Sequence, residues 1–204
     1  QQYSNKMNYE FRLYDFNISS RKMGDDEEEG GSFDADEDEA PTVSSQTFTI
    51  QMFGLNERGE TCSIIVEDYT PFFYVKVPDF WTESFKRDFQ KHMEDKMGAY
   101  YKGTLVECSI IKRKKLYGFD GGKEHKFVIL KFTNLTAFNK AKNMWYYNST
   151  NRNGESERKL SKNGYRYQSW NLELYEANIP PLLRFFHINE ISPSGWIKMQ
   201  SSHC

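Results

Sequence analysis

A cluster of basic residues is the part of this sequence whose residue types could act on a partner. Six cations fall within fifteen positions, and aromatic residues stand among them. Such a loop between two strands can hold a phosphate backbone, because each neutralised phosphate releases counterions. A solubilising hairpin tip is the other interpretation of a basic run this short. The candidate nucleic-acid-binding residues are Lys112, Arg113, Lys114, Lys115, Lys123 and Lys126.

Two further segments resemble metal-binding motifs but lack what the chemistry requires. Residues 33–37 read Phe-Asp-Ala-Asp-Glu, similar to the Phe-Asp-x-Glu of metal-dependent 3'–5' exonucleases, but they lie in an acidic run without a strand pattern. Residues 117–120 read Tyr-Gly-Phe-Asp and contain one aspartate, whereas two-metal phosphoryl transfer needs a pair. The sequence also shows no nucleophile with a base at a family spacing and no phosphate-binding Gly-rich loop. We therefore predict no catalytic, cofactor-binding or metal-binding residue in the chain.

The charge of the chain is divided unevenly along its length. The formal net charge is -2, but ten acidic residues and no basic one lie between Asp25 and Glu39. Outside that segment 27 basic residues stand against 19 acidic ones, a net charge of +8. A surplus of this size favours a phosphate-bearing partner.

Cysteine spacing and hydropathy restrict the class of protein further. Cys62, Cys108 and Cys204 lie far apart, which argues against a disulfide framework and a zinc site and suits a reducing compartment. No apolar run approaches the length of a membrane span, and the first residues show no signal-peptide pattern. The expectation is a soluble intracellular protein with no membrane partner.

The first part of the chain is predicted to form β-strands, which belong to the structure that positions the basic cluster. Apolar and polar residues alternate over 8–18 and 46–54, and residues 61–67 follow a turn as the return strand of a hairpin. The polar, acidic segment 19–45 between the first two strands is predicted to be a disordered insertion, because it cannot bury apolar surface. Residues 72–77 form a strongly apolar strand.

A strand–helix–strand–strand–helix order follows. Residues 81–97 repeat large apolar side chains every four positions and predict a helix; residues 104–111 and 127–132 predict strands, and 136–147 predict a second helix. This order is typical of an α+β fold: an antiparallel sheet combined with a ferredoxin-like or RNA-recognition-like α/β sandwich.

The remainder of the chain is less regular. Residues 148–164 are polar and rich in Gly, Asn and Ser, which predicts an exposed loop or hairpin tip. Asn178 can cap a short helix with Pro180 in its first turn, and Glu176 is expected to help fix its start. Arg184 is expected to pair inside the domain, and residues 196–199 are predicted to be a closing strand.

Residues 174–197, which run from Leu-Tyr-Glu-Ala-Asn-Ile through Leu-Leu-Arg-Phe-Phe-His-Ile to Ser-Pro-Ser-Gly-Trp-Ile, closely resemble a segment of family B DNA polymerases. Residues 72–78 look like the Pro-Tyr-Phe-Tyr-Val strand of that family, and residues 115–119 look like the segment before its next core strand. The resemblance covers 47–199 and is greatest to the delta-type enzymes of nucleocytoplasmic large DNA viruses.

This resemblance implies a longer parent enzyme. Residues 1–18 and 46–199 would form the non-catalytic N-terminal domain of a DNA-directed DNA polymerase, and 200–204 would begin a linker to a 3'–5' exonuclease domain. The domain would support the exonuclease domain and help guide template DNA. The resemblance implies Mg²⁺ as a cofactor of the parent enzyme and no cofactor for this chain. The parent enzyme would act in the host nucleus or in a cytoplasmic viral factory.

Two other functions stay open at this stage. A stand-alone module that binds single-stranded nucleic acid would need aromatic side chains of the middle strands to face solvent. The apolar run 127–130 looks buried on both faces instead. The third hypothesis is a protein that binds a partner, such as a histone, through its acidic segment. Partner binding that survives deletion of residues 24–40 would reject this hypothesis.

Overall fold

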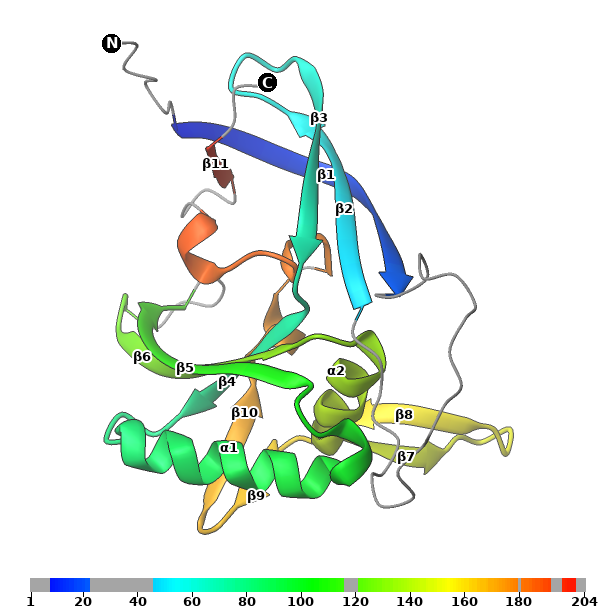
Figure 1. The fold of residues 1–204 in the computed structure, drawn as a ribbon, viewed down its shortest axis with the longest axis vertical. Helices are drawn as coiled ribbons and strands as arrows, with labels where there is room; N and C mark the ends of the chain where they lie inside the picture. The colour runs from blue at the N-terminus through cyan, green and yellow to red at the C-terminus, as the bar shows by residue number, and fades with distance from the viewer. Residues whose placement is uncertain (1–7, 23–45, 116–120, 180, 192–195, 201–204) are drawn as a thin grey trace, which may run out of the picture.

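The computed structural model describes residues 8–22, 46–115, 121–179, 181–191 and 196–200. Its strands form a four-stranded, a five-stranded and a two-stranded sheet (Figure 1). The strands are β1 (Asn8–Lys22), β2 (Gln46–Leu55), β3 (Thr61–Tyr69), β4 (Phe72–Val77), β5 (Leu105–Lys114), β6 (Glu124–Phe132), β7 (Tyr146–Thr150), β8 (Ser156–Leu160), β9 (Tyr165–Tyr167), β10 (Trp170–Leu174) and β11 (Ile197–Gln200). The α-helices are α1 (Glu83–Met97) and α2 (Leu135–Lys142), and single 3₁₀ turns are η1 (Ala99–Tyr101), η2 (Asn143–Trp145), η3 (Tyr175–Asn178), η4 (Pro181–Leu183) and η5 (Ile188–Glu190). The predicted α+β class is confirmed.

The five-stranded sheet positions the basic cluster. Its order is β5-β6-β4-β10-β9, and every neighbouring pair is antiparallel. The central strands β4 and β6 are the apolar runs predicted at 72–77 and 127–132, and their residues are almost all buried. β5 and β6 extend beyond the predicted boundaries to Lys114 and from Glu124, because their polar ends still pair with each other.

Both α-helices pack on one face of this sheet (Figure 1). α1 begins two residues later than predicted, after Thr82, because Trp81 belongs to a turn in which its N–H donates to the carbonyl of Pro78. The side chain of Asn134 caps α2 by accepting hydrogen bonds from the N–H groups of Thr136 and Ala137. The helix predicted to reach residue 147 is α-helical only to Lys142, since η2 and β7 follow at once.

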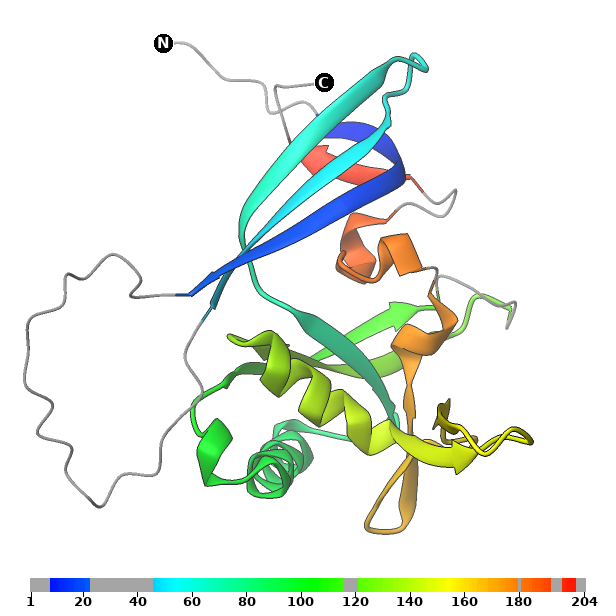
Figure 2. The same cartoon turned by 90° about the vertical axis from the view of Figure 1, so that its right-hand side faces the viewer.

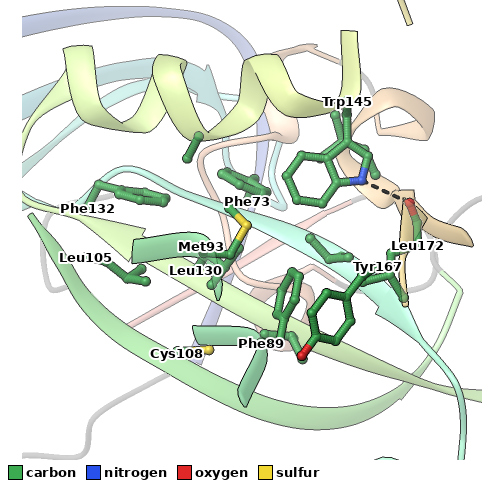
Figure 3. Packing of buried hydrophobic residues seen from close by; sticks show 14 of the residues in the cluster. Phe73, Phe89, Met93, Leu105, Cys108, Leu130, Phe132, Trp145, Tyr167 and Leu172 are labelled. Carbon is green, nitrogen blue, oxygen red and sulfur yellow. Dashed lines mark hydrogen bonds between the residues drawn. The ribbon is translucent and has the colours of Figure 1, made fainter. Parts of the chain in front are cut away.

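The core beneath the helices is rich in aromatic residues, which explains much of the aromatic content of the chain. Phe73 lies near its centre, with its ring stacked on Phe132 and edge-on to Trp145 (Figure 3). The indole N–H of Trp145 donates a hydrogen bond to the carbonyl of Leu172 at 2.9 Å, so the buried polar group is satisfied. Each fully buried ring of this size contributes about 1.5–3 kcal/mol by its removal from water.

The opposite face of the five-stranded sheet is also covered. Residues of β2 and β3 and the segment 175–191 form a second apolar core against it. Figure 2 shows the four-stranded sheet and this segment on the side of the five-stranded sheet away from α1. The amide N–H of Ile188 donates to the hydroxyl of Tyr74 at 2.9 Å, and the His187 ring stacks on Phe72 with centroids 4.3 Å apart. The C-terminal segment is therefore held to the sheet by polar and ring contacts as well as by burial.

The four-stranded sheet has the order β11-β1-β2-β3. β1 and β2 pair antiparallel, which confirms that the acidic segment is inserted between neighbouring strands. β1 continues to Lys22 rather than ending at Ile18, because residues 19–22 pair with 46–49. The other residues of the predicted insertion, 23–45, lie outside the described residues.

The C-terminal half agrees with one sequence expectation and differs from two. Most of 148–164 belongs to an exposed β-hairpin made by β7 and β8, the hairpin alternative of the prediction, which projects from the body (Figure 1). β9 and β10 were not predicted at all. The short helix expected from Asn178 is replaced by η3 and η4, because Ile179, which precedes Pro180, is extended (φ -100°, ψ 132°), the conformation favoured before proline.

The structure differs from the expectation for the cysteines and shows the character of the helices. Cys62 is disulfide-bonded, contrary to the expectation from the cysteine spacing, whereas Cys108 is a free buried thiol. Among the helices of the described ranges, none is both long enough and apolar enough to cross a membrane.

Candidate nucleic-acid interface

The predicted basic residues lie on the two arms of the β5–β6 hairpin. Lys112 is opposite Lys126, Arg113 is opposite His125, and Lys114 is opposite Glu124. The hairpin tip itself, residues 116–120, lies outside the described residues, and with it the Tyr-Gly-Phe-Asp segment.

Strand alternation divides this cluster between the two faces of the sheet. Ile110 contacts the core beneath the helices and Ile111 contacts the opposite core. Lys112 and Lys114 therefore lie on the helix-covered face, together with Lys126, while Arg113 lies on the other. The sequence run looks continuous, but its charges point in two directions.

Two of the six cations have structural partners that reduce their availability. The Lys126 ammonium donates to the carbonyl of Trp81 at 2.7 Å and is half-buried. The Arg113 guanidinium donates to the carbonyl of Lys112 at 2.8 Å. Lys126 is thus a link between β6 and the turn before α1 as much as a surface charge.

The remaining cations are open to solvent to different degrees. The Lys112 side chain is 61% exposed and lies 3.8 Å from a carboxylate oxygen of Glu124, a distance at which an exposed ion pair contributes little. Lys114 and Lys123 are exposed, and Lys115 is half-buried. Lysines directly opposite each other across a ladder repel, so the Lys112–Lys126 pair favours an external anion. DNA contact at this hairpin stays a prediction.

The aromatic side chains of the middle strands cannot serve as a stacking surface. Phe72, Tyr74 and Phe127 lie on the sheet face opposite the helices, and each is 3% exposed or less. The four-stranded sheet and the segment 175–191 cover them. The alternative of a module that stacks bases on this face is therefore wrong in that form.

The polar residues of the segment 175–191 have structural partners. The Nε–H of Arg184 donates to the carbonyl of Ile179 at 2.9 Å, which confirms its predicted role inside the domain. Glu176 does not fix the start of a helix; its carboxylate lies 3.2 Å from the ammonium of Lys142 on α2, and both side chains are largely buried. Burial raises the pKa of Glu176, and the Lys142 charge opposes this shift.

Outside this segment, two ionisable side chains that could exchange a proton lie in hydrogen-bonding contact: His92 of α1 and Tyr165 of β9. The Nε2 atom of His92 lies 2.7 Å from the Tyr165 hydroxyl. Burial lowers the pKa of His92 and raises that of Tyr165, so both groups favour their neutral forms. Within the described residues, no three His, Cys, Asp or Glu side chains are placed to hold a metal ion. The acidic residues 33–37 lie outside them.

Sequence reasoning missed an exposed aromatic residue close to the hairpin. Phe80 lies in the turn between β4 and α1, directly before Trp81, whose carbonyl accepts the Lys126 hydrogen bond. Its side chain is 55% exposed. The only signal in the sequence was an aromatic pair immediately after Pro78-Asp79, which does not reveal which of the two rings is buried.

Comparison with known proteins identifies relatives along most of the chain. It is 46% identical over 191 residues, 94% of its length, to a DNA polymerase of Phaeocystis pouchetii virus. It is 26% identical over 92% of its length to a DNA polymerase of Acanthamoeba polyphaga mimivirus, and 25% identical over 78% to the DNA polymerase delta catalytic subunit of Schizosaccharomyces pombe. The chain spans 18%, 10% and 14% of these relatives. No protein-family model matches it.

Proposed function

Since the chain is homologous to the family B DNA polymerases of large DNA viruses and to polymerase delta, we propose that it is the N-terminal, non-catalytic part of a DNA-directed DNA polymerase. The observation that supports this most is the match over 94% of the chain to 18% of a viral DNA polymerase. A segment of that proportion is a domain of a larger enzyme. Its partners are then template DNA and the exonuclease and polymerase domains of the same parent.

The fold supports a scaffolding role. Two apolar cores lie on opposite faces of one sheet, and they join the N-terminal strands, both helices and the segment 175–191 into one body. The order β4–α1–β5–β6–α2–β10, with the sheet order β5-β6-β4-β10, is that expected of a ferredoxin-like unit. Such a body can hold the β5–β6 hairpin in a fixed position relative to neighbouring domains.

The catalytic chemistry is assigned to other parts of the parent. Two-metal phosphoryl transfer and metal-dependent exonuclease action both need clustered carboxylates. We assign the Mg²⁺ sites of the parent to its exonuclease and palm domains rather than to this chain. The parent would act in the host nucleus or in a cytoplasmic viral factory.

The DNA-binding part of the proposal concerns the β5–β6 hairpin. Lys112, Lys114 and Lys123 provide exposed positive charge, and the chain outside its acidic segment has a net charge of +8. Exposed lysine side chains bind DNA phosphates and not the edges of the bases. The affinity for DNA should therefore not depend on the DNA sequence and should fall strongly as the salt concentration rises. Template guidance needs that kind of binding.

The test is DNA binding by the purified chain, measured by fluorescence anisotropy at several salt concentrations. We expect weak binding that is lost as salt rises, and no nuclease or nucleotidyl-transfer activity with Mg²⁺. Replacement of Lys112, Lys114 and Lys123 by Glu should abolish binding, and the control is Lys96→Glu with Lys102→Glu, two exposed lysines near the other end of α1. Equal losses in both variants would contradict the assignment to the hairpin, and metal-dependent activity would contradict the non-catalytic role.

A further inference from the structure

We propose that Phe80 and Trp170 form a stacking platform for an unpaired base of single-stranded DNA, beside the lysines of the β5–β6 hairpin. This inference rests on the proposed function and specifies how that partner binds. Aromatic rings that hold bases next to a basic surface that holds the backbone are the usual means of binding single strands without sequence preference.

The two rings of the platform pack together with Phe85 at one corner of the five-stranded sheet. The Phe80 ring lies edge-on to Phe85 of α1, with centroids 5.6 Å apart, and tilted against Trp170 of β10 at 5.5 Å. The Phe85 and Trp170 rings are 5.8 Å apart. Phe85 and Trp170 are half-buried, so Phe80, 55% exposed, is the ring most open to a ligand.

The exposure of Phe80 is imposed by its neighbour. Trp81 is fully buried, stacked on Phe85 and edge-on to Trp170, and its N–H closes the turn through the carbonyl of Pro78. Because Trp81 takes the buried position, Phe80 cannot enter the core without breaking that turn. Leaving a Phe side chain in water forgoes about 1.5–3 kcal/mol, some of which a stacked base would recover.

The platform and the basic hairpin are joined directly. The Lys126 ammonium donates to the carbonyl of Trp81, the residue after Phe80, and Lys126 is opposite Lys112 on the ladder. Lys112, Lys114 and Lys126 share the sheet face on which α1, Phe85 and Trp170 lie. A strand with its phosphates along these lysines would therefore bring a base to Phe80.

The charges at the corner favour a base over a phosphate on the ring. Asp79 is exposed next to Phe80, and Glu83, which is also exposed, pairs with Lys86 at 2.7 Å. Acidic groups at the turn repel phosphate, while the cations are concentrated on the hairpin. The bases of a duplex are already stacked on each other, so the occupant is a single strand.

The experiment compares two labelled oligonucleotides of equal length, an oligothymidylate and an abasic strand, by anisotropy with the 204-residue chain. Phe80→Ala should weaken oligothymidylate binding about 5- to 150-fold, the loss expected for one stacked base. It should leave abasic-strand binding unchanged, and Phe80→Trp should restore the affinity. Tyr100→Ala, at an exposed aromatic in η1, is the matched control and should have no effect. Thermal unfolding of each variant verifies that it is folded.

Charge reversals separate this inference from the proposed function. Lys114→Glu should weaken binding of both oligonucleotides more than Arg113→Glu, because Arg113 lies on the opposite face. If Phe80→Ala binds both strands normally while Lys114→Glu weakens both, the platform is overturned and the DNA-guiding role stands. If none of these variants alters binding, the DNA-binding part of the proposed function fails as well.

Discussion

The Lys126 ammonium donates a 2.7 Å hydrogen bond to the carbonyl of Trp81, across 45 residues of sequence. This bond joins the first part of β6 to the turn that precedes α1. It places a cation of the β5–β6 hairpin against the backbone of Trp81, the residue that follows the exposed Phe80. Neither segment by itself predicts that arrangement.

Replacement of Lys126 by Met should separate its structural role from its charge. The variant keeps the aliphatic stem but leaves the Trp81 carbonyl without this donor, which should cost about 1–3 kcal/mol in the free energy of unfolding. Urea denaturation followed by tryptophan fluorescence measures this cost. Lys123→Met, at an exposed position of the same hairpin, should change stability by less than about 0.5 kcal/mol. Equal stability of the two variants would show that the bond to Trp81 contributes nothing.

Glu176→Gln should change how stability depends on pH. Burial raises the folded-state pKa of Glu176 above its unfolded value, so the folded protein binds this proton more tightly than the unfolded chain. The stabilisation is fully present below the unfolded pKa, about 4.3 for Glu, and is lost as pH rises through the higher folded pKa. The wild-type protein should therefore lose stability relative to Glu176→Gln as pH rises above about 4.3. Parallel curves of unfolding free energy against pH for the two proteins would contradict the raised pKa.

Gly54→Ala should destabilise the four-stranded sheet through a steric clash. A Cβ atom at Gly54 of β2 would overlap the carbonyl oxygen of Arg12 and the ring of Phe11, which is 1% exposed and cannot move freely. We expect a loss of about 1–3 kcal/mol or more, the usual cost of overpacking. Gly59→Ala is the control; its Cβ would meet open space, and its positive φ of 77° should cost about 1–2 kcal/mol. A smaller loss at Gly54 than at Gly59 would be inconsistent with the packing.

Cys108 should be unreactive in the folded protein. Burial beneath α1 raises the pKa of its thiol to about 12, so almost no thiolate exists at pH 8. Alkylation by iodoacetamide, followed by mass spectrometry of the peptide that contains Cys108, should proceed at least ten times faster in denaturing urea than in buffer. Rapid labelling of the folded chain would mean that the core between β5 and α1 opens easily.

The sequence by itself determined the α+β class, the central strands and the approximate positions of both helices. The run 72–77 and the run 127–130 are apolar enough to be buried whatever their neighbours are, and the four-residue repeat of 81–97 fits only a helix packed on a surface. The homology to DNA polymerases was also visible in residues 174–197. These features are local, and local patterns are what a sequence displays directly.

The tertiary structure decided which strands pair and which side chains contact each other. Strand register divides the basic run between two faces and turns Lys126 toward Trp81; such pairing depends on contacts between residues far apart in the chain. The short strands β9 and β10 alternate apolar and polar residues, but runs of three and five residues are too short to stand out as strands before their sheet neighbours are known. Burial of Trp81 leaves Phe80 exposed, although the two adjacent aromatic residues look equivalent in the sequence. Which ring meets solvent is settled by the packing of α1 and β10, and the proposed base-stacking platform depends on that packing.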